Sequence, residues 1–196
     1  MKKAMILGLY HSNNTVFSTK DIALLWEESN TRLVKKRIYR YVKAGKLYSI
    51  RKGFYAKDKN YNKYELAIKI YNPSYLSFET ILGKAGVTFQ HYGQIFIASY
   101  LSREIVVDGQ TYRYRKIKDS ILTNSAGIEY KDNYFGAISE RAFLDIIYLD
   151  KNYAFDNLSV LDWNKVLEIL PIYSNRRMEK EVKSFLKRYG IRYNSS

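Results

Sequence analysis

The segment from Asn30 to Gly45 constrains the fold more than any other part of this chain. Drawn as a helix at about 100° per residue, it places four apolar side chains on one side: Val34, Ile38, Tyr41 and Val42. Its other side is mainly basic and consists of Arg32, Lys36, Tyr39, Arg40 and Lys43. Gly45 can adopt the left-handed conformation that ends many helices. The pattern therefore predicts an amphipathic helix whose exposed face is cationic.

The residues on both sides of this helix predict its neighbours. Residues 46–50 and 54–56 are strand-like, and the tight turn 51–53 separates them. Upstream, Ser18 and Asp21 form a variant of the capping box at the start of another helix, and residues 27–30 form the turn between the two helices. This order of helix, turn, helix and basic hairpin is typical of a winged helix-turn-helix, which we expect to occupy residues 1–60.

A helix-turn-helix places the start of its second helix in the major groove of DNA, while the first helix crosses the backbone. The candidate DNA-binding residues lie at the start of the first helix, on the exposed side of the second and in the hairpin: Ser18, Lys20, Thr31, Arg32, Lys35, Lys36, Tyr39, Arg40, Lys43, Arg51 and Lys52. Arginine can donate two parallel hydrogen bonds to a base, so Arg32 and Arg40 are the candidates for base reading.

A cationic helix face has a second explanation, because many charged runs are simply solvated. Such faces normally contain Glu four residues away from Lys or Arg, but residues 31–43 include no acidic residue. The cations repel one another unless a polyanion neutralises them. We therefore expect double-stranded DNA as the partner, with two copies of the protein on an inverted repeat.

The remaining sequence predicts an α+β domain at residues 61–196, with antiparallel strands and a basic helical tail. We expect helices near residues 61–71, 77–86, 139–147, 162–170 and 174–189, with Ser77 and Ser139 as N-caps. Strands are expected at residues 95–101, 103–107, 111–117, 127–130 and 134–138. Asp108 and Gly109 predict a type I′ turn between two of these strands. The chain as a whole is thus expected to be an α+β protein.

The net charge of +14 is unevenly distributed. Residues 1–60 contain 14 Lys and Arg against 4 Asp and Glu, residues 61–170 contain 12 against 13, and residues 171–196 contain 7 against 2. This balance attracts polyanions. The lack of cysteine excludes disulfides and thiolate metal sites, and no apolar run is long enough for a membrane span. The first ten residues fit a helix better than a signal peptide, so we expect a cytoplasmic protein that binds no membrane.

Two further basic clusters lie beyond residue 60. Arg113 and Arg115 share one face of a predicted strand, where they either extend a nucleic-acid surface or protect an edge strand from aggregation, and edge protection is slightly favoured. A stripe along the last predicted helix consists of Arg176, Lys180, Lys183 and Lys187. The stripe fits contact with DNA or with a protein partner as well as it fits plain solvation.

The residue pattern does not indicate an enzyme. His11 and His91 are the only histidines, and neither has metal ligands or triad partners nearby in the sequence. We therefore expect no catalytic residues, no metal and no cofactor. The 20 Tyr and 9 Phe could stack on bases of a single strand, but most fit positions in a core. Tyr39 is the exception, because it shares the cationic helix face.

Four segments together resemble the AbiEi family, whose members are antitoxin-type regulators encoded beside AbiEii nucleotidyltransferase toxins in phage-defence operons. The segments are Gly45–Ala56, Asn72–Leu82, Gln94–Ala98 and Gly136–Tyr148. The first is similar to the family pattern G-x-L-x-x-[VI]-x-[RK]-G-x-Y-A, and the last to A-[TS]-x-E-[RK]-A-[LF]-x-D. In the second segment, Ile81 stands where alanine is usual. The resemblance extends over about residues 15–149.

The resemblance implies a repressor and antitoxin of a type IV toxin-antitoxin, or abortive infection, system. Such a protein autoregulates its operon by binding inverted repeats in the promoter, and it counteracts an AbiEii-like nucleotidyltransferase toxin through its C-terminal domain. Two other functions are compatible with the sequence. One is a protein-interaction module whose charge serves the toxin, and the other is an RNA-binding protein that acts on the toxin's nucleic-acid substrate.

Overall fold

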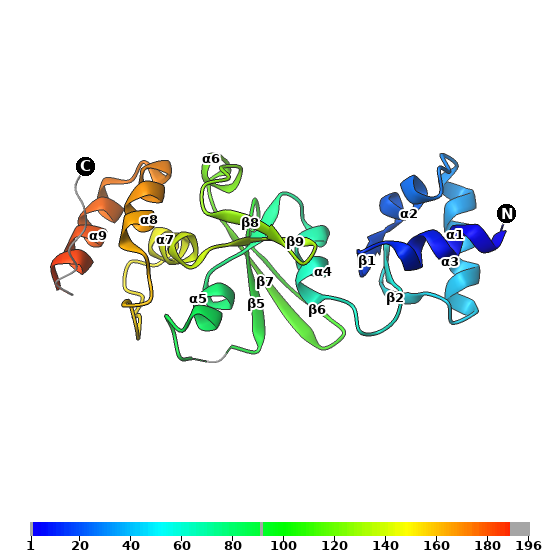
Figure 1. The fold of residues 1–196 in the computed structure, drawn as a ribbon, viewed down its shortest axis with the longest axis horizontal. Helices are drawn as coiled ribbons and strands as arrows, with labels where there is room; N and C mark the ends of the chain where they lie inside the picture. Colours follow the sequence, from blue (N-terminus) through cyan, green and yellow to red (C-terminus); the bar gives the residue numbers. More distant parts are fainter. Residues whose placement is uncertain (1, 91, 189–196) are drawn as a thin grey trace.

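The computed structural model describes residues 2–90 and 92–188 and shows an elongated α+β protein (Figure 1). Helices and a small sheet form the N-terminal end, a larger sheet lies in the middle, and further helices form the C-terminal end. The helices are α1 (Lys2–His11), α2 (Thr19–Leu25), α3 (Thr31–Lys43), α4 (Lys63–Ile70), α5 (Glu79–Ala85), α6 (Asp119–Leu122), α7 (Ser139–Leu149), α8 (Trp163–Ile169), the 3₁₀ helix η1 (Leu170–Tyr173) and α9 (Arg176–Arg188). The strands are β1 (Val16–Ser18), β2 (Tyr48–Arg51), β3 (Phe54–Ala56), β4 (Ser74–Leu76), β5 (Gln94–Ser99), β6 (Arg103–Val107), β7 (Gln110–Lys116), β8 (Ile128–Lys131) and β9 (Tyr134–Ala137).

Local signals in the sequence set the boundaries of α2 and α3. Ser18 and Asp21 form the expected capping box of α2, and the side-chain oxygen of Asn30 caps α3. At the other end of α3, Gly45 has a φ of +65°, and the backbone N–H of Lys46 donates to the carbonyl of Tyr41. This hydrogen bond and the left-handed glycine are features of a Schellman motif, so the predicted end of this helix is confirmed.

The N-terminal end has its own apolar core, in which α1, α2 and α3 pack together. The buried residues of this core are Ile6, Leu9, Phe17, Ile22, Trp26, Val34, Ile38 and Leu47. The predicted buried face of α3 is thus confirmed. A short strand that the sequence did not predict, β1, pairs with β3 and extends the β2–β3 hairpin to a three-stranded antiparallel sheet of order β1-β3-β2.

The central sheet has six strands in the order β6-β7-β5-β4-β9-β8. Helices cover one face, and α4 packs on the other, where its buried cluster continues into Val16, Ile50 and Ala56 of the small N-terminal sheet. Ile95 and Ile97 of β5 face the second side, whereas Phe96 and Ala98 face the first, so residues 95–98 are apolar on both faces. The sheet is mixed, because β5 pairs with β7 and β4 pairs with β9 in parallel.

Most predicted elements of the central sheet are confirmed, including the turn at Asp108 and Gly109, where φ is +48° and +73°. Three expectations are wrong. Ser77 does not cap α5, because its hydroxyl donates to Asp145 and the helix begins two residues later. Ser139 is the first residue of α7 and not its cap. The strand that carries Arg113 and Arg115 is not an edge strand, because β7 lies between β6 and β5.

A buried ion pair between Arg141 and Asp145 lies at the centre of the helical layer. Both side chains are fully buried, and Arg141 Nε lies 3.3 Å from Asp145 Oδ1. The carboxylate also accepts hydrogen bonds from the hydroxyls of Ser77 (2.7 Å), Tyr75 (3.0 Å) and Tyr173 (2.7 Å). The guanidinium donates to the carbonyls of residues 121 and 126 and to the Tyr75 hydroxyl. Such complete pairing offsets the large desolvation cost of two buried charges.

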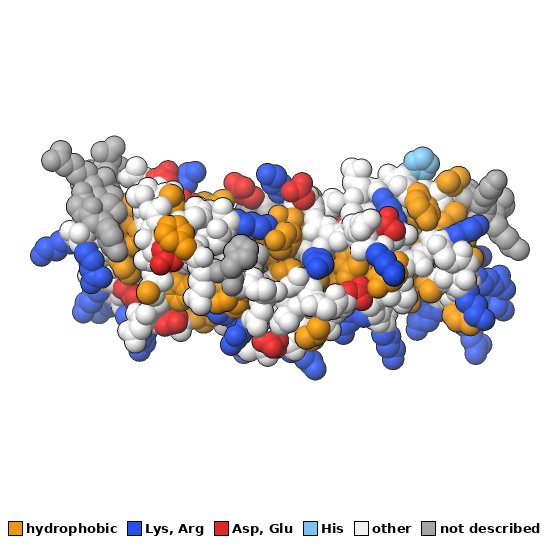
Figure 2. All heavy atoms as spheres, turned by 90° about the horizontal axis from the view of Figure 1, so that it is seen from below, with side chains coloured by type: hydrophobic (Ala, Val, Ile, Leu, Met, Phe, Trp, Pro, Cys, Tyr) orange, Lys and Arg blue, Asp and Glu red, His pale blue; other side chains and the backbone are white. Residues whose placement is uncertain are grey.

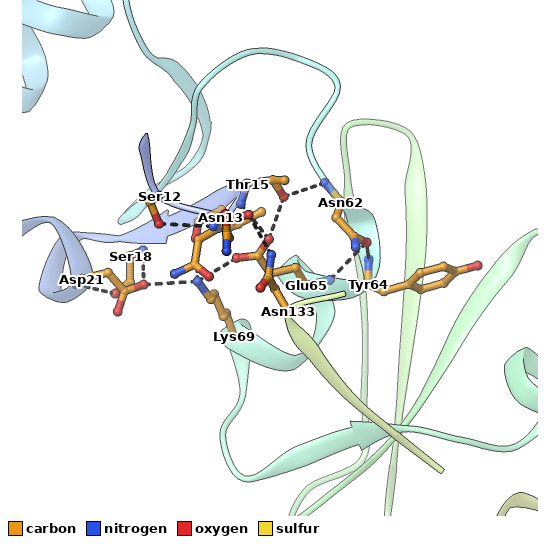
Figure 3. Close-up of polar contacts among 12 residues, drawn as sticks. Ser12, Asn13, Thr15, Ser18, Asp21, Asn62, Tyr64, Glu65, Lys69 and Asn133 are labelled. Carbon is orange, nitrogen blue, oxygen red and sulfur yellow. Dashed lines mark hydrogen bonds and ion pairs between the residues drawn. The ribbon is translucent and has the colours of Figure 1, made fainter. Parts of the chain in front are cut away.

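The carboxylate of Glu65 in α4 joins the N-terminal end to the central sheet (Figure 3). Its Oε2 accepts from the backbone N–H of Thr15 (2.8 Å) and from the Thr15 hydroxyl (2.7 Å), and its Oε1 lies 2.9 Å from Nζ of Lys69. Lys69 also donates to the carbonyl of Val16 at 2.6 Å and lies 3.5 Å from Asp21. Because Asp21 belongs to the capping box of α2, these contacts tie α4 to the start of α2.

Candidate nucleic-acid interface

The side of α3 that faces away from the core is open to solvent. Val34 and Ile38 are buried, whereas the residues predicted to bind DNA from this helix are all exposed: Thr31, Arg32, Lys35, Lys36, Tyr39, Arg40 and Lys43. One helix therefore brings seven of the eleven candidate DNA-binding residues onto a single surface. We call these seven residues the α3 face.

The cations of the α3 face have no acidic partners within the described part of the chain. Salt bridges to Arg32, Lys35, Lys36, Arg40 or Lys43 are absent there, whereas Arg37 at the border of the face lies 2.9 Å from Glu28. Lys43 lies over the ring of Tyr39, 5.5 Å from its centre. Figure 2 shows Lys and Arg gathered at the N-terminal end of the molecule (right), with few Asp or Glu among them. This end therefore presents an unneutralised positive surface.

The other candidates lie where the β2–β3 hairpin meets the start of α2. The backbone N–H of Thr19 donates to the carbonyl of Gly53 at 2.9 Å. Lys20 follows Thr19 and Lys52 precedes Gly53, so this hydrogen bond brings the two exposed lysines to the same region of the surface. Arg51 is only half-buried and belongs to β2 instead of the turn. Ser18 uses its hydroxyl to accept from the N–H of Asp21 at 3.1 Å. Its role is therefore to start α2.

The hairpin is also fixed from the other side. The hydroxyls of Tyr48 in β2 and of Tyr61 both donate to Oδ2 of Asp108, at 3.1 and 2.9 Å. The hydrogen bond to Asp108 raises the pKa of Tyr48, and burial together with the same carboxylate raises the pKa of Tyr61. Asp108 lies in the turn between β6 and β7, so the hairpin has a defined position relative to the central sheet.

Sequence reasoning missed two apolar residues at this surface. Leu33 is 41% exposed, and Leu24 near the end of α2 is 77% exposed. A helical wheel places Leu33 on the cationic side of α3, next to Arg40, so this signal was available in the sequence. Exposed leucines beside basic residues can contact the methyl groups of thymine in a major groove.

The basic clusters on β7 and on α9 differ in whether their charges have partners within the fold. Arg115 donates to Glu79 at 2.8 Å and packs against the rings of Phe78 and Phe96, so its charge is used within the fold. Arg113 is exposed and lies 4.0 Å from Glu104. The stripe on α9 is exposed and, among the described residues, has no salt bridge: Arg176, Lys180, Lys183 and Lys187. It lies at the opposite end of the molecule from α3.

The fold and the α3 face define an α+β protein with a cationic helix presented at one end. Comparison with models of protein families gives no match for the chain, and comparison with curated proteins gives none either. Within residues 2–90 and 92–188, no group of three His, Asp or Glu side chains is placed to hold a metal ion. The helices over the same residues include none that is long and apolar enough to cross a membrane.

Proposed function

We propose that this protein is a DNA-binding transcriptional repressor whose residues 1–60 form a winged helix-turn-helix. The α3 face supports this proposal most strongly, because its cations are exposed and form no salt bridge with any described residue. In this proposal α3 is the recognition helix and the β2–β3 hairpin is the wing. The activity needs no catalysis, since occupancy of the promoter excludes the polymerase.

Each part of the surface has a role in this proposal. The N-terminal half of α3 enters the major groove, where Arg32 reads base edges and Leu33 contacts thymine methyl groups. Arg40 is the second base-reading candidate, and Lys20 and Lys52 contact the phosphate backbone on either side of the groove. Two copies occupy an inverted repeat with half-sites separated by whole helical turns of about 10.5 bp.

Charge reversal on the α3 face tests the proposal. We expect the double variant Lys36→Glu, Arg40→Glu to bind the DNA upstream of its own operon at least about 100-fold more weakly than wild type in gel shifts, because each lost contact costs about 1–3 kcal/mol. The control is Lys151→Glu, Lys165→Glu, which makes the same change in net charge at two exposed lysines outside the α3 face. Equal affinity of the two double variants for this DNA would exclude α3 as the DNA-binding element.

We also propose that residues 61–196 antagonise an AbiEii-like nucleotidyltransferase toxin, as the resemblance to AbiEi proteins implies. The buried Arg141–Asp145 pair bears on the structure of this domain, and the antagonism itself rests on the resemblance. Arg141 and Asp145 come from the fourth resembling segment, and their partners Tyr75 and Ser77 come from the second. The two segments therefore meet in one hydrogen-bond network and belong to one packed unit.

Co-expression with the neighbouring toxin separates the two activities. We expect the variant Lys36→Glu, Arg40→Glu to protect cells from the toxin as well as wild type does while failing to repress the promoter. Deleting residues 1–60 is a poor alternative, because Val16, Ile50 and Ala56 share a buried cluster with Leu66 and Ile97. If the double variant loses protection while remaining folded, antagonism depends on the α3 face and the proposed division of roles is wrong.

A further inference from the structure

The strand β8 forms one edge of the central sheet and pairs with β9 on one side only (Figure 1). The backbone N–H of Ile138 donates to the carbonyl of Gly127 at 2.9 Å, and hydrogen-bonded positions recur at every second residue of an antiparallel ladder. The backbone groups of residues 129 and 131 therefore face β9. Those of Tyr130 point to the open side, where they have no hydrogen-bond partner among the described residues.

The neighbouring backbone groups on this open side are partly satisfied within the chain. The N–H of Ile128 donates to the carbonyl of Ser125 at 3.0 Å, and the carbonyl of Asp132 accepts from Nδ2 of Asn62 at 3.2 Å. The carbonyl of Ile128 and the N–H of Asp132 have no such partner in the described part of the chain. A free acceptor thus lies two residues before Tyr130 and a free donor two residues after it.

The side chains of β8 are complementary to a second copy of the same strand. Successive side chains of a strand point to opposite faces, so Glu129 and Lys131 share one face and Tyr130 lies on the other. Glu129 and Lys131 are exposed, and neither forms a salt bridge with a described residue. In an antiparallel pair centred on Tyr130, Glu129 of each copy lies opposite Lys131 of the other. Two lysines at these positions would instead keep copies apart, as they do at many sheet edges.

An exposed aromatic pair lies beside the same edge. Tyr130 is 60% exposed and Phe135 of β9 is 49% exposed, and their ring centres are 4.9 Å apart. Both residues line a cavity of about 690 Å³, so there is space for further rings next to them. Neighbouring aromatic rings that remain exposed are typical of a surface that a protein partner covers.

The distribution of charge favours contact between two copies at the central sheet. Residues 61–170 contain 12 Lys and Arg against 13 Asp and Glu, whereas residues 1–60 contain 14 against 4 and residues 171–196 contain 7 against 2. Two copies therefore repel each other strongly through their ends and little through their middle. The edge at β8 belongs to this middle part.

We propose that two copies of this chain pair through β8, antiparallel and about a two-fold axis at Tyr130, so that their central sheets become one continuous sheet. Tyr130 exchanges backbone hydrogen bonds with Tyr130 of the second copy, and the free N–H of Asp132 donates to the free carbonyl of Ile128 across the interface. Salt bridges between Glu129 and Lys131 select this register. The inference rests on the proposed function only in that this dimer would supply the two copies on an inverted repeat.

Charge reversal tests the register of this dimer. Sedimentation equilibrium of the full chain from about 10 µM to about 1 mM measures self-association, since so short an edge supports a weak dimer. We expect Glu129→Lys and Lys131→Glu each to weaken the dimer by about tenfold, because either change makes both attractive pairs repulsive. An equal mixture of the two variants should dimerise about as well as wild type, because every lysine again faces a glutamate across the interface. A mere effect on folding would not be reversed by mixing.

A proline on the open side of the strand tests the backbone contact. Tyr130→Pro removes an N–H that points away from β9, so β8 stays in its own sheet while the hydrogen bonds to the second copy are lost. The matched control is Val106→Pro in β6, the other edge strand, where Val107 and Gln110 close the hairpin and residue 106 points outward. We expect Tyr130→Pro to abolish the dimer and Val106→Pro to leave it unchanged, with circular dichroism like that of wild type in both.

Three results would each overturn the proposal. The wild-type chain could stay monomeric up to about 1 mM, the mixed charge variants could associate no better than either variant alone, or Val106→Pro could disrupt the dimer as much as Tyr130→Pro does. The mixed charge variants decide the question even if Tyr130→Pro unfolds. None of these measurements uses DNA, so this inference and the proposed repressor activity can fail separately.

Discussion

At the scale of single residues, Gly127 shows how tightly the buried ion pair is enclosed. Its φ is +70°, and a Cβ atom there would lie 2.8 Å from Cδ1 of Ile169 and 2.9 Å from Cβ of Arg141. Gly86 has a similar φ of +73°, but no heavy atom of a described residue would lie within 4 Å of its Cβ. We expect Gly86→Ala to lower the free energy of unfolding by about 1 kcal/mol, from backbone strain alone. Gly127→Ala adds overpacking and should cost about 2–4 kcal/mol in urea denaturation.

Equal losses in these two glycine variants would mean that the surroundings of Arg141 yield easily.

At the same scale, some residues of the fold and of the candidate site could be predicted from the sequence and others could not. The exposure of Arg32 and Arg40 follows from the helical period, which is local information. The pairing of Glu79 with Arg115 joins residues 36 positions apart, and their spacing in the sequence carries no trace of it. Buried polar pairs of this kind depend on tertiary packing.

At the scale of helices and strands, the correct predictions are those that local chemistry determines. The capping box at Ser18, the glycine at position 45 and the hairpin turn at Asp108 each involve residues within five positions of one another. The strands β1 and β4 were missed because three residues are too few to show a period of two, and neither belongs to a tight hairpin such as the one that revealed the equally short β3. The position of β7 inside the sheet was missed because strand order depends on contacts between distant segments.

At the scale of the whole molecule, the junction around Glu65 and Lys69 decides how the N-terminal end is held. Glu65 is fully buried and binds Thr15, and Lys69 reaches Asp21 at the start of α2 (Figure 3). Apolar contacts add to these polar ones, since Val16, Ile50 and Ala56 of the small N-terminal sheet share a buried cluster with Leu66 of α4. The proposed recognition helix is therefore tied to the central sheet by polar and apolar contacts, which favours binding in one orientation.

Buried tyrosines give the whole molecule a defined response to high pH. Burial is the main cause of a raised pKa at the buried Tyr61, Tyr75, Tyr112, Tyr114 and Tyr173 and at the half-buried Tyr153. An unfolded tyrosine loses its proton near pH 10, whereas these keep theirs. Between the two pKa values the folded state binds more protons than the unfolded state. Stability is therefore fully present below about pH 10 and falls as the pH rises further.

The slope of this decline can be measured by urea denaturation at a series of pH values above about 10. Tyr75 and Tyr173 are almost completely buried, and each should contribute about 1.4 kcal/mol per pH unit. Tyr173→Phe removes one buried hydroxyl, so it should reduce the slope by about this amount while lowering stability at neutral pH through the lost hydrogen bond to Asp145. An unchanged slope in Tyr173→Phe would show that this hydroxyl ionises inside the folded protein, which contradicts its place beside the Asp145 carboxylate.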